Sequence, residues 1–364
     1  MSQTSADIRR FLSRKCAGLG IPVNGVFELT PRCNLRCKMC YVRLTPEQMA
    51  PLGSERTAEQ WLDMARQARD AGMAFLLVTG GEPMLRNDFC QIWEGLSQMG
   101  LSISINTNGT MLRPKIRTLF HNLPPAQVNI TLYGTSREDY EALCQNPDAF
   151  DAVVDGLNWL QQEGILVHLN ATIVPTNYHK WMEMEQFAKS RGLELRMTSY
   201  CFPPNRRDCS CFERLEPEQA GRLIAQEILY RDGPEAIRQR FRDLDSPLPN
   251  TCELDIGEPM ACLAGHSQFW LTWNGGMTPC AMLTHPITQP FDDGFLPAWE
   301  QLRQLCDAIR LCPECNACPE RRSCMNCAAV TFAETGHFDG KPEYMCRLNR
   351  AYRETVTALA KTVE

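Results

Sequence analysis

The sequence predicts an α/β fold built on a parallel β-sheet. Six short apolar segments are separated by helical segments at intervals of roughly 20 to 40 residues. Chemically distinctive motifs directly follow the first four of these strands, and ligands of parallel βα folds bind at the carboxyl ends of the strands. Periodicity alone does not separate an open doubly wound sheet from one closed, or nearly closed, into a barrel.

The predicted strands set the repeat of the fold. They cover Val26–Thr30, Met73–Thr79, Leu101–Thr107, Gln127–Leu132, Ile165–Val174 and Leu193–Ser199.

Caps and apolar faces predict the helices between the strands. Thr57 and Gln60 form a capping-box pattern, and an apolar face that includes Trp61 follows it until Gly72 ends the helix. Pro114 stands where a first helical turn begins. The other predicted helices are Asn87–Met99, one ending at Gly164, one capped by Asn177 and ending near Gly192, Glu216–Tyr230 and Glu235–Arg242.

Three cysteines follow the first predicted strand. Cys33, Cys37 and Cys40 have the spacing C-x3-C-x2-C and can direct three thiolates at one soft metal centre. A structural zinc site needs four protein ligands, whereas three thiolates on a four-iron cluster leave one iron free for another ligand. The alternatives are a zinc knuckle with a distant fourth ligand, or three unrelated buried thiols.

This cysteine motif resembles that of the radical S-adenosylmethionine (radical SAM) enzymes, with Met39 at a usually aromatic position. The resemblance implies a partial (β/α)6 barrel. It also implies a [4Fe-4S] cluster whose open iron chelates S-adenosylmethionine, so that reductive cleavage gives a 5′-deoxyadenosyl radical that abstracts a substrate hydrogen.

The same resemblance implies cofactor contacts at the strand ends. The segment Gly80, Gly81, Glu82 and Pro83 matches the family's second motif, in which glycines let backbone carbonyls approach the methionine ammonium. The alternative is an ordinary strand-to-helix turn. Tyr41, Asn108 and Thr131 are the further predicted contacts; an arginine that many sulfatase-maturing relatives use is replaced here by the segment Tyr140–Cys144.

An irregular segment from Tyr200 to Arg214 follows the sixth strand. It contains Cys201, Cys209 and Cys211, each a candidate hydrogen-atom donor, and its Arg206 and Arg207 are candidates for holding a substrate carboxylate. The alternative is a solvated loop with incidental cysteines.

Ten of the 19 cysteines lie from Cys252 to Cys346. Phe269–Gly275 predicts a hairpin whose Asn-Gly turn brings the flanking cysteines together. The pattern resembles the SPASM extension of radical SAM enzymes, which implies two auxiliary [4Fe-4S] clusters. The implied ligands are Cys252, Cys262, Cys280 and Cys327 for the first cluster, and Cys315, Cys318, Cys324 and Cys346 for the second.

Two alternatives apply to this cysteine-rich region. Cys312 is a possible substitute for Cys315, and Cys-x2-Cys pairs also build zinc ribbons. Four thiolates close each cluster to substrate, so the clusters are expected to transfer electrons or stabilise the fold. The remaining cysteines are interpreted as core or incidental thiols: Cys16, Cys90, Cys144 and Cys306.

Length and composition limit the other classes of function. A chain of 364 residues buries enough apolar surface to fold without disulfides, so 19 cysteines point to metal binding in a reducing cytoplasm. The net charge of −6 without a basic cluster disfavours nucleic acid, and no apolar run reaches membrane-spanning length. The expected organisation is 1–25, an N-terminal segment too short for a winged-helix peptide-binding domain; 26–215, the barrel; 216–250, a helical linker; and 251–364, the SPASM domain.

These resemblances lead to a hypothesis about the substrate. We expect an enzyme that modifies a ribosomally made peptide by crosslinking, thioether formation or epimerisation, with an electron donor such as flavodoxin or ferredoxin. A sulfatase-maturase-like oxidase is the nearest alternative. Relatives with that activity have an aspartate base where this chain has Ala281, although Glu253 or Asp255 can supply a carboxylate. Two further alternatives are a small-molecule radical SAM enzyme acting on a sugar or porphyrin, and a non-enzymatic metal-binding module.

Overall fold

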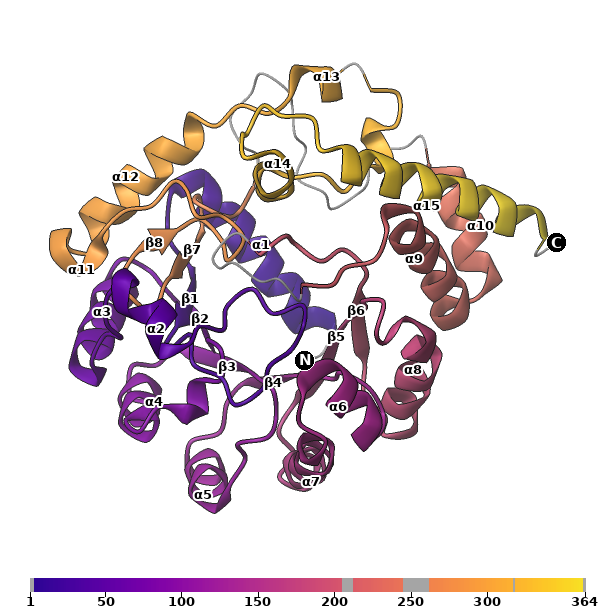
Figure 1. Cartoon of the computed structure of the whole chain (residues 1–364). Helices are drawn as coiled ribbons and strands as arrows, with labels where there is room; N and C mark the ends of the chain where they lie inside the picture. Colours follow the sequence, from indigo (N-terminus) through magenta and orange to yellow (C-terminus); the bar gives the residue numbers. More distant parts are fainter. Residues whose placement is uncertain (1–2, 205–211, 245–261, 317, 363–364) are drawn as a thin grey trace.

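The structure is a computed structural model that describes residues 3–204, 212–244, 262–316 and 318–362. One eight-stranded sheet runs through the molecule in the order β6-β5-β4-β3-β2-β1-β7-β8. All neighbouring pairs are parallel except β7 with β8. Figure 1 shows the strands as an arc with α3 to α8 outside it, as expected for a partial barrel.

The first six strands and their helices form the repeating part of the fold. The strands are β1 Asn24–Glu28, β2 Phe75–Thr79, β3 Ser102–Thr107, β4 Gln127–Thr131, β5 Val167–Thr172 and β6 Leu195–Thr198. The helices are α1 Gln3–Leu19, α2 Pro46–Met49, α3 Ala58–Asp70, α4 Phe89–Ser97, α5 Pro114–Asn122, α6 Arg137–Cys144, α7 Asp148–Gln162 and α8 Trp181–Ser190, with short 3-10 turns at Ala50–Leu52, Pro83–Leu85 and Tyr178–Lys180.

The rest of the chain adds a hairpin and helices. These elements are α9 Pro217–Asp232, α10 Pro234–Asp243, β7 Gln268–Leu271, β8 Met277–Thr278, α11 Pro290–Asp293, α12 Phe295–Asp307, α13 Pro313–Asn316, a 3-10 turn at Arg321–Ser323, α14 Ala328–Thr335 and α15 Glu343–Thr362. None of the helices in the described part of the chain has the length and apolar character that crossing a membrane requires.

Alternation along each strand separates two faces of the sheet. One face packs under the helices; Phe27 of β1, for example, lies 5.1 Å from the Trp61 ring of α3, measured between ring centroids. Ile105, Val128 and Leu169 belong to the same buried core. Residues between these positions point to the opposite, inner face of the arc, because successive side chains of a strand alternate.

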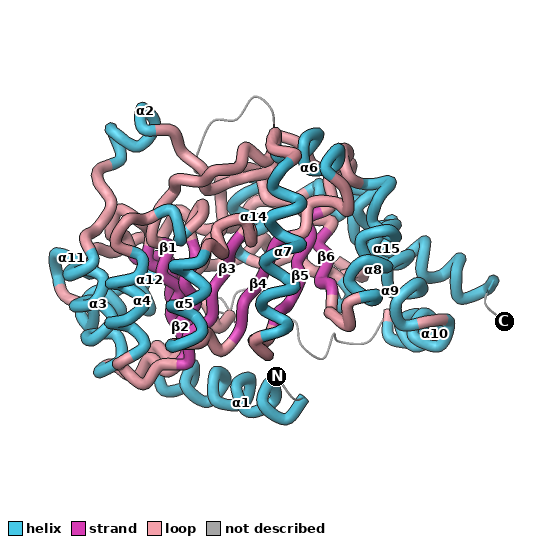
Figure 2. The backbone as a smooth tube through the Cα atoms, turned by 90° about the horizontal axis from the view of Figure 1, so that it is seen from below, coloured by secondary structure: helices cyan, strands magenta, loops and turns pink. Residues whose placement is uncertain are grey.

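Helix α1 closes the end of the barrel at which the strands begin (Figure 2). Its Arg9 donates two hydrogen bonds to the Asn24 side chain at the start of β1 and lies 4.6 Å from the ring centroid of Phe75, the first residue of β2. The motifs at the carboxyl ends of the strands therefore lie at the opposite end of the barrel.

The six predicted strands and the hairpin are confirmed. Thr57 and Gln60 form the predicted capping box, and Trp270 of β7 pairs with Thr278 of β8. Asn177 lies at the N-cap position of the 3-10 turn that leads into α8, but the prediction that its side chain caps the helix is wrong. Its side-chain oxygen accepts from the backbone N–H of Val174, and α8 begins four residues later without a side-chain cap. The predicted domain boundaries stay predictions, although β7 shares the sheet with β1.

Candidate functional site

The loop after β1 holds the three motif cysteines. The backbone N–H of Leu44 donates to the Pro31 carbonyl, which closes the loop, and Cys40 N–H donates to the Cys37 carbonyl. Cys37 is buried, whereas Cys33 and Cys40 are partly exposed. The loop therefore offers three thiols at the carboxyl end of the sheet, with two of them accessible.

Hydrogen-bond donors surround these sulfur atoms. Leu35 N–H lies 3.4 Å from Cys33 Sγ, and Arg43 N–H lies 3.2 Å from Cys40 Sγ. Burial, the largest cause, raises the pKa of Cys33 to about 12. A positive metal is therefore needed to hold this group as a thiolate. The donor set of three thiols in a polar loop fits a soft iron centre.

The glycine motif after β2 contacts the start of the cysteine loop. Gly81 N–H donates to the Thr30 carbonyl over 2.7 Å, and Glu82 N–H donates to the Arg32 carbonyl over 2.8 Å. A Cβ on Gly81 would lie 2.4 Å from the Arg32 carbonyl oxygen. The close approach of two backbone segments therefore requires a glycine here. This is a second reason for the glycine, besides the cofactor contact predicted from the sequence.

Glu82 joins three motifs. Its carboxylate accepts from the Thr107 hydroxyl and from the Asn108 N–H, both over 2.8 Å, and from the Met84 N–H over 3.2 Å. Burial raises the pKa of Glu82 to about 7, against these three hydrogen bonds, which lower it. Asn108 in turn donates from Nδ2 to Asn34 Oδ1 over 2.9 Å and to Cys33 Sγ over 3.5 Å. The glycine, Asn108 and cysteine motifs thus form one connected network.

The other predicted cofactor contacts lie at the same end of the sheet. Pro83 is buried and opens the 3-10 turn that follows Glu82. Thr131 ends β4 and is in register with Asn170 of β5. Tyr41 packs against the apolar cluster of Val26, Trp270 and Ala281. Contacts of these residues with a cofactor stay predictions.

Three cysteines of the hairpin region interact electrostatically. Burial raises the pKa of Cys280 to about 11, and Cys327 and Cys262 add smaller contributions. Cys306, interpreted from the sequence as a core or incidental thiol, is buried and interacts with Cys262 and Cys280. The fourth predicted ligand, Cys252, lies outside the described residues.

A second set of cysteines gathers before and within α15. The pKa of Cys315 is raised to about 12, first by burial and then by Cys312, which hydrogen-bonds to it, with Cys346 and Cys324 contributing less. Cys324 and Cys346 both interact with Cys318. The predicted ligands are thus neighbours, and Cys312 lies among them. Within the described ranges no three His, Cys, Asp or Glu side chains are arranged as the ligands of a single metal ion.

One of the three candidate hydrogen donors is described. Cys201 is buried, with Sγ 4.0 Å from the Met39 carbonyl oxygen in the cysteine loop. Cys209 and Cys211 lie outside the described residues, as do Arg206, Arg207, Glu253 and Asp255.

The sequence interpretation missed a fourth thiol at the first site. Cys144 ends α6 and is completely buried, with its Sγ 3.5 Å from Cys37 Sγ. Its position beside the cysteine loop depends on how α6 packs after the fourth strand. No local motif identifies it.

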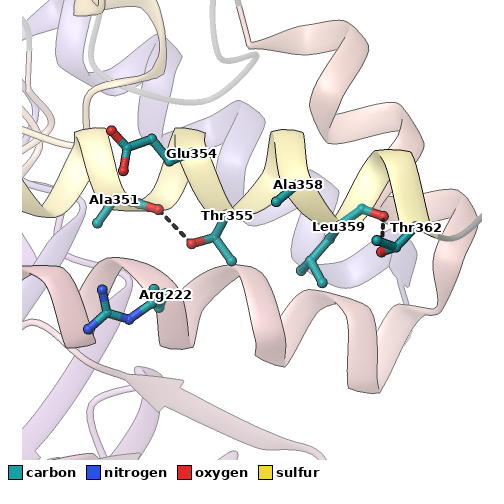
Figure 3. Close-up of a pocket in the computed structure, with 7 residues that line it drawn as sticks. All are labelled: Arg222, Ala351, Glu354, Thr355, Ala358, Leu359 and Thr362. Carbon is teal, nitrogen blue, oxygen red and sulfur yellow. Dashed lines mark hydrogen bonds between the residues drawn. The ribbon is translucent and has the colours of Figure 1, made fainter.

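Two surface hollows lie away from the motif cysteines. The first, about 350 Å³, is lined by Arg222 of α9 and, from α15, by Ala351, Glu354, Thr355, Ala358, Leu359 and Thr362 (Figure 3). The second, about 560 Å³, lies between α4 and α5 and includes Cys90 and Lys115. Neither contains a predicted ligand.

A family model matches most of the barrel, and known proteins resemble this chain over most of its length. The profile of the radical SAM superfamily matches residues 27–188. The AdoMet-dependent heme synthase of Methanosarcina barkeri is 23% identical over 326 residues, which cover 86% of this chain and 93% of that protein. Streptococcus suis SuiB, solved with its precursor peptide SuiA, superposes with a TM-score of 0.68 at 16% identity over 94% of this chain and 80% of that one.

A second solved structure has the same fold over its whole length. The protein anSMEcpe with bound AdoMet has a TM-score of 0.67 at 13% identity and covers 94% of this chain and 100% of that one. At these identities the two structural likenesses show the fold.

Proposed function

Residues 27–188 are a radical SAM domain and the chain is an enzyme, and on this premise we propose that Cys33, Cys37 and Cys40 hold a [4Fe-4S] cluster beside S-adenosylmethionine. When bound, the cluster supplies the electron that cleaves the sulfonium to a 5′-deoxyadenosyl radical. The observation that supports this assignment best is the network in which Asn108 reaches both Cys33 Sγ and, through its N–H, the Glu82 carboxylate.

The chain's own residues position the reacting groups. Glu82 fixes the end of β3 against the turn after β2, since it accepts from Thr107 and Asn108 of one segment and Met84 of the other. Gly81 keeps that turn against the start of the cysteine loop. The predicted cofactor contact Thr131 lies on β4, the neighbour of β3, at the same edge.

We propose a peptide substrate, and the inner face of the sheet supports this choice. Asn106, Asn129 and His168 are in register across β3, β4 and β5, and Asn129 Nδ2 donates to Asn106 Oδ1 over 2.8 Å. Gln127 donates to Asn129 on the same face. The Nδ1 atom of His168 is buried without a hydrogen-bond partner among the described residues. Such a face matches peptide amides, which both donate and accept.

A tetrapyrrole is the second candidate substrate. The likeness to the heme synthase covers most of both chains, which favours it. A row of side-chain amides suits the broad apolar faces of a macrocycle less well. Sulfatase maturation is a weaker candidate because Ala281, buried against Val26 and Trp270, stands at the position of the base.

The auxiliary sites complete the proposal. Cys262, Cys280 and Cys327, with Cys252, are proposed to hold one cluster, and Cys315, Cys318, Cys324 and Cys346 the other. Closed clusters of this kind transfer electrons, so crosslinking would return an electron through them. The initial electron is proposed to come from a flavodoxin or ferredoxin in the cytoplasm.

Two measurements test these proposals. After anaerobic reconstitution, three clusters predict about twelve irons per chain, whereas one cluster with a zinc-bound C-terminal region predicts about four irons plus zinc. Reduced enzyme should then cleave S-adenosylmethionine and change the mass of a peptide encoded beside its gene. If 5′-deoxyadenosine forms only with an iron porphyrin, the peptide proposal is wrong.

A further inference from the structure

A buried thiol lies next to one proposed cluster ligand. Cys144 Sγ is 3.5 Å from Cys37 Sγ, and its side chain is completely inaccessible to solvent. Two backbone hydrogen bonds hold it there. The N–H of Arg36 donates to the Cys144 carbonyl over 3.0 Å, and the N–H of Lys38 donates to the Leu143 carbonyl over 3.2 Å. The end of α6 is therefore attached to the cysteine loop on both sides of Cys37.

Both the backbone and neighbouring side chains supply hydrogen-bond partners to the three proposed ligands. Cys33 and Cys40 each have a backbone N–H directed at the sulfur. Cys37 has two side-chain partners, the Cys144 thiol and the Tyr133 side chain. A backbone N–H donor is present whatever side chain its residue carries, whereas the thiol donor is present only because residue 144 is a cysteine.

The chemistry of a ligand decides the direction of the Cys37–Cys144 hydrogen bond. A cysteine that ligates iron is a thiolate and only accepts hydrogen bonds. The shared proton must then belong to Cys144. Donors to cluster sulfurs stabilise the extra negative charge of the reduced cluster and so raise its reduction potential.

We propose that Cys144 is a positioning residue that donates its S–H to the Cys37 thiolate and makes the first cluster easier to reduce. This inference rests on the proposed function, because it takes Cys37 as a ligand. It assigns a role to a thiol that the C-x3-C-x2-C motif does not contain.

Redox titration of the full-length reconstituted enzyme tests the proposal. The first cluster is identified in the electron paramagnetic resonance spectrum by the change that S-adenosylmethionine causes. Cys144→Ala should keep the iron content and shift the midpoint potential of this cluster to more negative values. Cys144→Ser keeps a hydrogen-bond donor, so its midpoint potential should return most of the way to that of the parent enzyme. Cys90→Ala, a partly exposed thiol of α4, is the control and should leave the potential unchanged.

Other outcomes overturn the proposal in distinguishable ways. An unchanged potential in Cys144→Ala means that the thiol only fills space. Iron loss in both Cys144 variants, equal to that of Cys37→Ala, means that Cys144 is itself a ligand. If Cys144→Ala does not fold, Cys144→Val, which fills the space without a hydrogen-bond donor, replaces it and should show the same negative shift; an unchanged potential in Cys144→Val overturns the proposal. Failure of the proposed function gives a different result. If Cys37 is not a cluster ligand, Cys37→Ala keeps the full iron content of the parent enzyme.

Discussion

Gly81 lies where the turn after β2 meets the start of the cysteine loop. Its N–H donates to the Thr30 carbonyl, and a Cβ at this position would be 2.4 Å from one backbone oxygen and 2.8 Å from another, those of Arg32 and Pro31. Backbone atoms cannot move aside as the end of a flexible side chain can. An added methyl group must therefore displace the loop that bears the cysteines.

We expect Gly81→Ala to lower the iron content of the first cluster by roughly half or more, because small displacements of a ligand loop weaken metal binding by about tenfold or more. Iron analysis and the S-adenosylmethionine-sensitive resonance signal measure this. Gly18→Ala is the control, since a methyl group added to this residue of α1 would have no atom within 4 Å of it. Equal iron in both variants would show that the loop tolerates the displacement.

Individual site residues differ in how far the sequence could identify them. The three motif cysteines and Gly80 to Pro83 were predicted because both are short contiguous motifs that resemble those of a known family. Cys144 was not, since its approach to Cys37 spans 107 positions and depends on helix packing. The role of Glu82 as a link to Thr107 and Asn108 also requires the three-dimensional arrangement of two strand ends.

At the scale of elements, α8 and α9 share a buried acidic pair. Glu227 of α9 forms an ion pair with Arg231 over 2.8 Å, and Glu185 of α8 has an oxygen without a hydrogen-bond partner among the described residues. Burial is the largest cause that raises the pKa of Glu227 to about 7, and Glu185 adds to it.

This raised pKa predicts a pH-dependent stability. The folded state holds the Glu227 proton more tightly than the unfolded state, whose pKa is near 4.5. The contribution is therefore fully present below about pH 4.5 and is lost as the pH rises through about 7. In urea unfolding, Glu227→Gln should gain stability relative to the parent between about pH 5 and pH 8. Glu183 is an exposed residue of α8, and Glu183→Gln is the control that should show no such gain. If the free energy of unfolding varies with pH in the same way in the parent and in Glu227→Gln, the prediction is wrong.

Helices α9 and α15, which line the hollow in Figure 3, pack closely at a glycine. A Cβ on Gly221 would lie 2.2 Å from the Leu348 carbonyl oxygen and 2.9 Å from the Tyr352 nitrogen. We expect Gly221→Ala to lower the free energy of unfolding by about 1–2 kcal/mol, because overpacking outweighs the gain in helix propensity. Denaturant titration measures it, with Gly18→Ala again as the helical control. A stabilised variant would mean that the two helices separate without cost.

Elements were predicted better than their junctions. The strands were found because each alternates or is uniformly apolar between turn residues, and the Asn-Gly pair located the hairpin. Asn177 misled the prediction because asparagine caps and asparagine turns look alike in sequence. Its oxygen accepts from a residue before it, Val174, so it stabilises the turn after β5. That β7 joins β1 in a parallel pairing is a long-range contact that no local pattern encodes.

In the whole molecule, a half-buried ion pair joins the segment after β6 to the C-terminal helices. The Glu334 carboxylate of α14 accepts from the Tyr200 hydroxyl and from Arg214 Nη1, both over 2.7 Å. The Arg214 guanidinium lies 4.1 Å from the ring centroid of Tyr344 on α15. Cys201, beside the cysteine loop, and Cys327, at the start of α14, flank this group. The group thus interacts with Cys201, which contacts the cysteine loop, and with Cys327, a proposed ligand of an auxiliary cluster.

We expect Glu334→Gln to lower the free energy of unfolding by about 2–4 kcal/mol, because the Glu334 side chain is only 7% exposed and the change leaves Arg214 without its charge partner. If the link also sets the relative position of the proposed clusters, the spin–spin interaction between them should weaken in the reduced, reconstituted variant. Glu218→Gln breaks an exposed pair with Arg347 and is the matched control, with an expected loss of about 1 kcal/mol or less. Equal losses in the two variants would contradict the view that this link connects the barrel to the C-terminal region. A loss of stability with an unchanged spin–spin interaction would limit its role to folding.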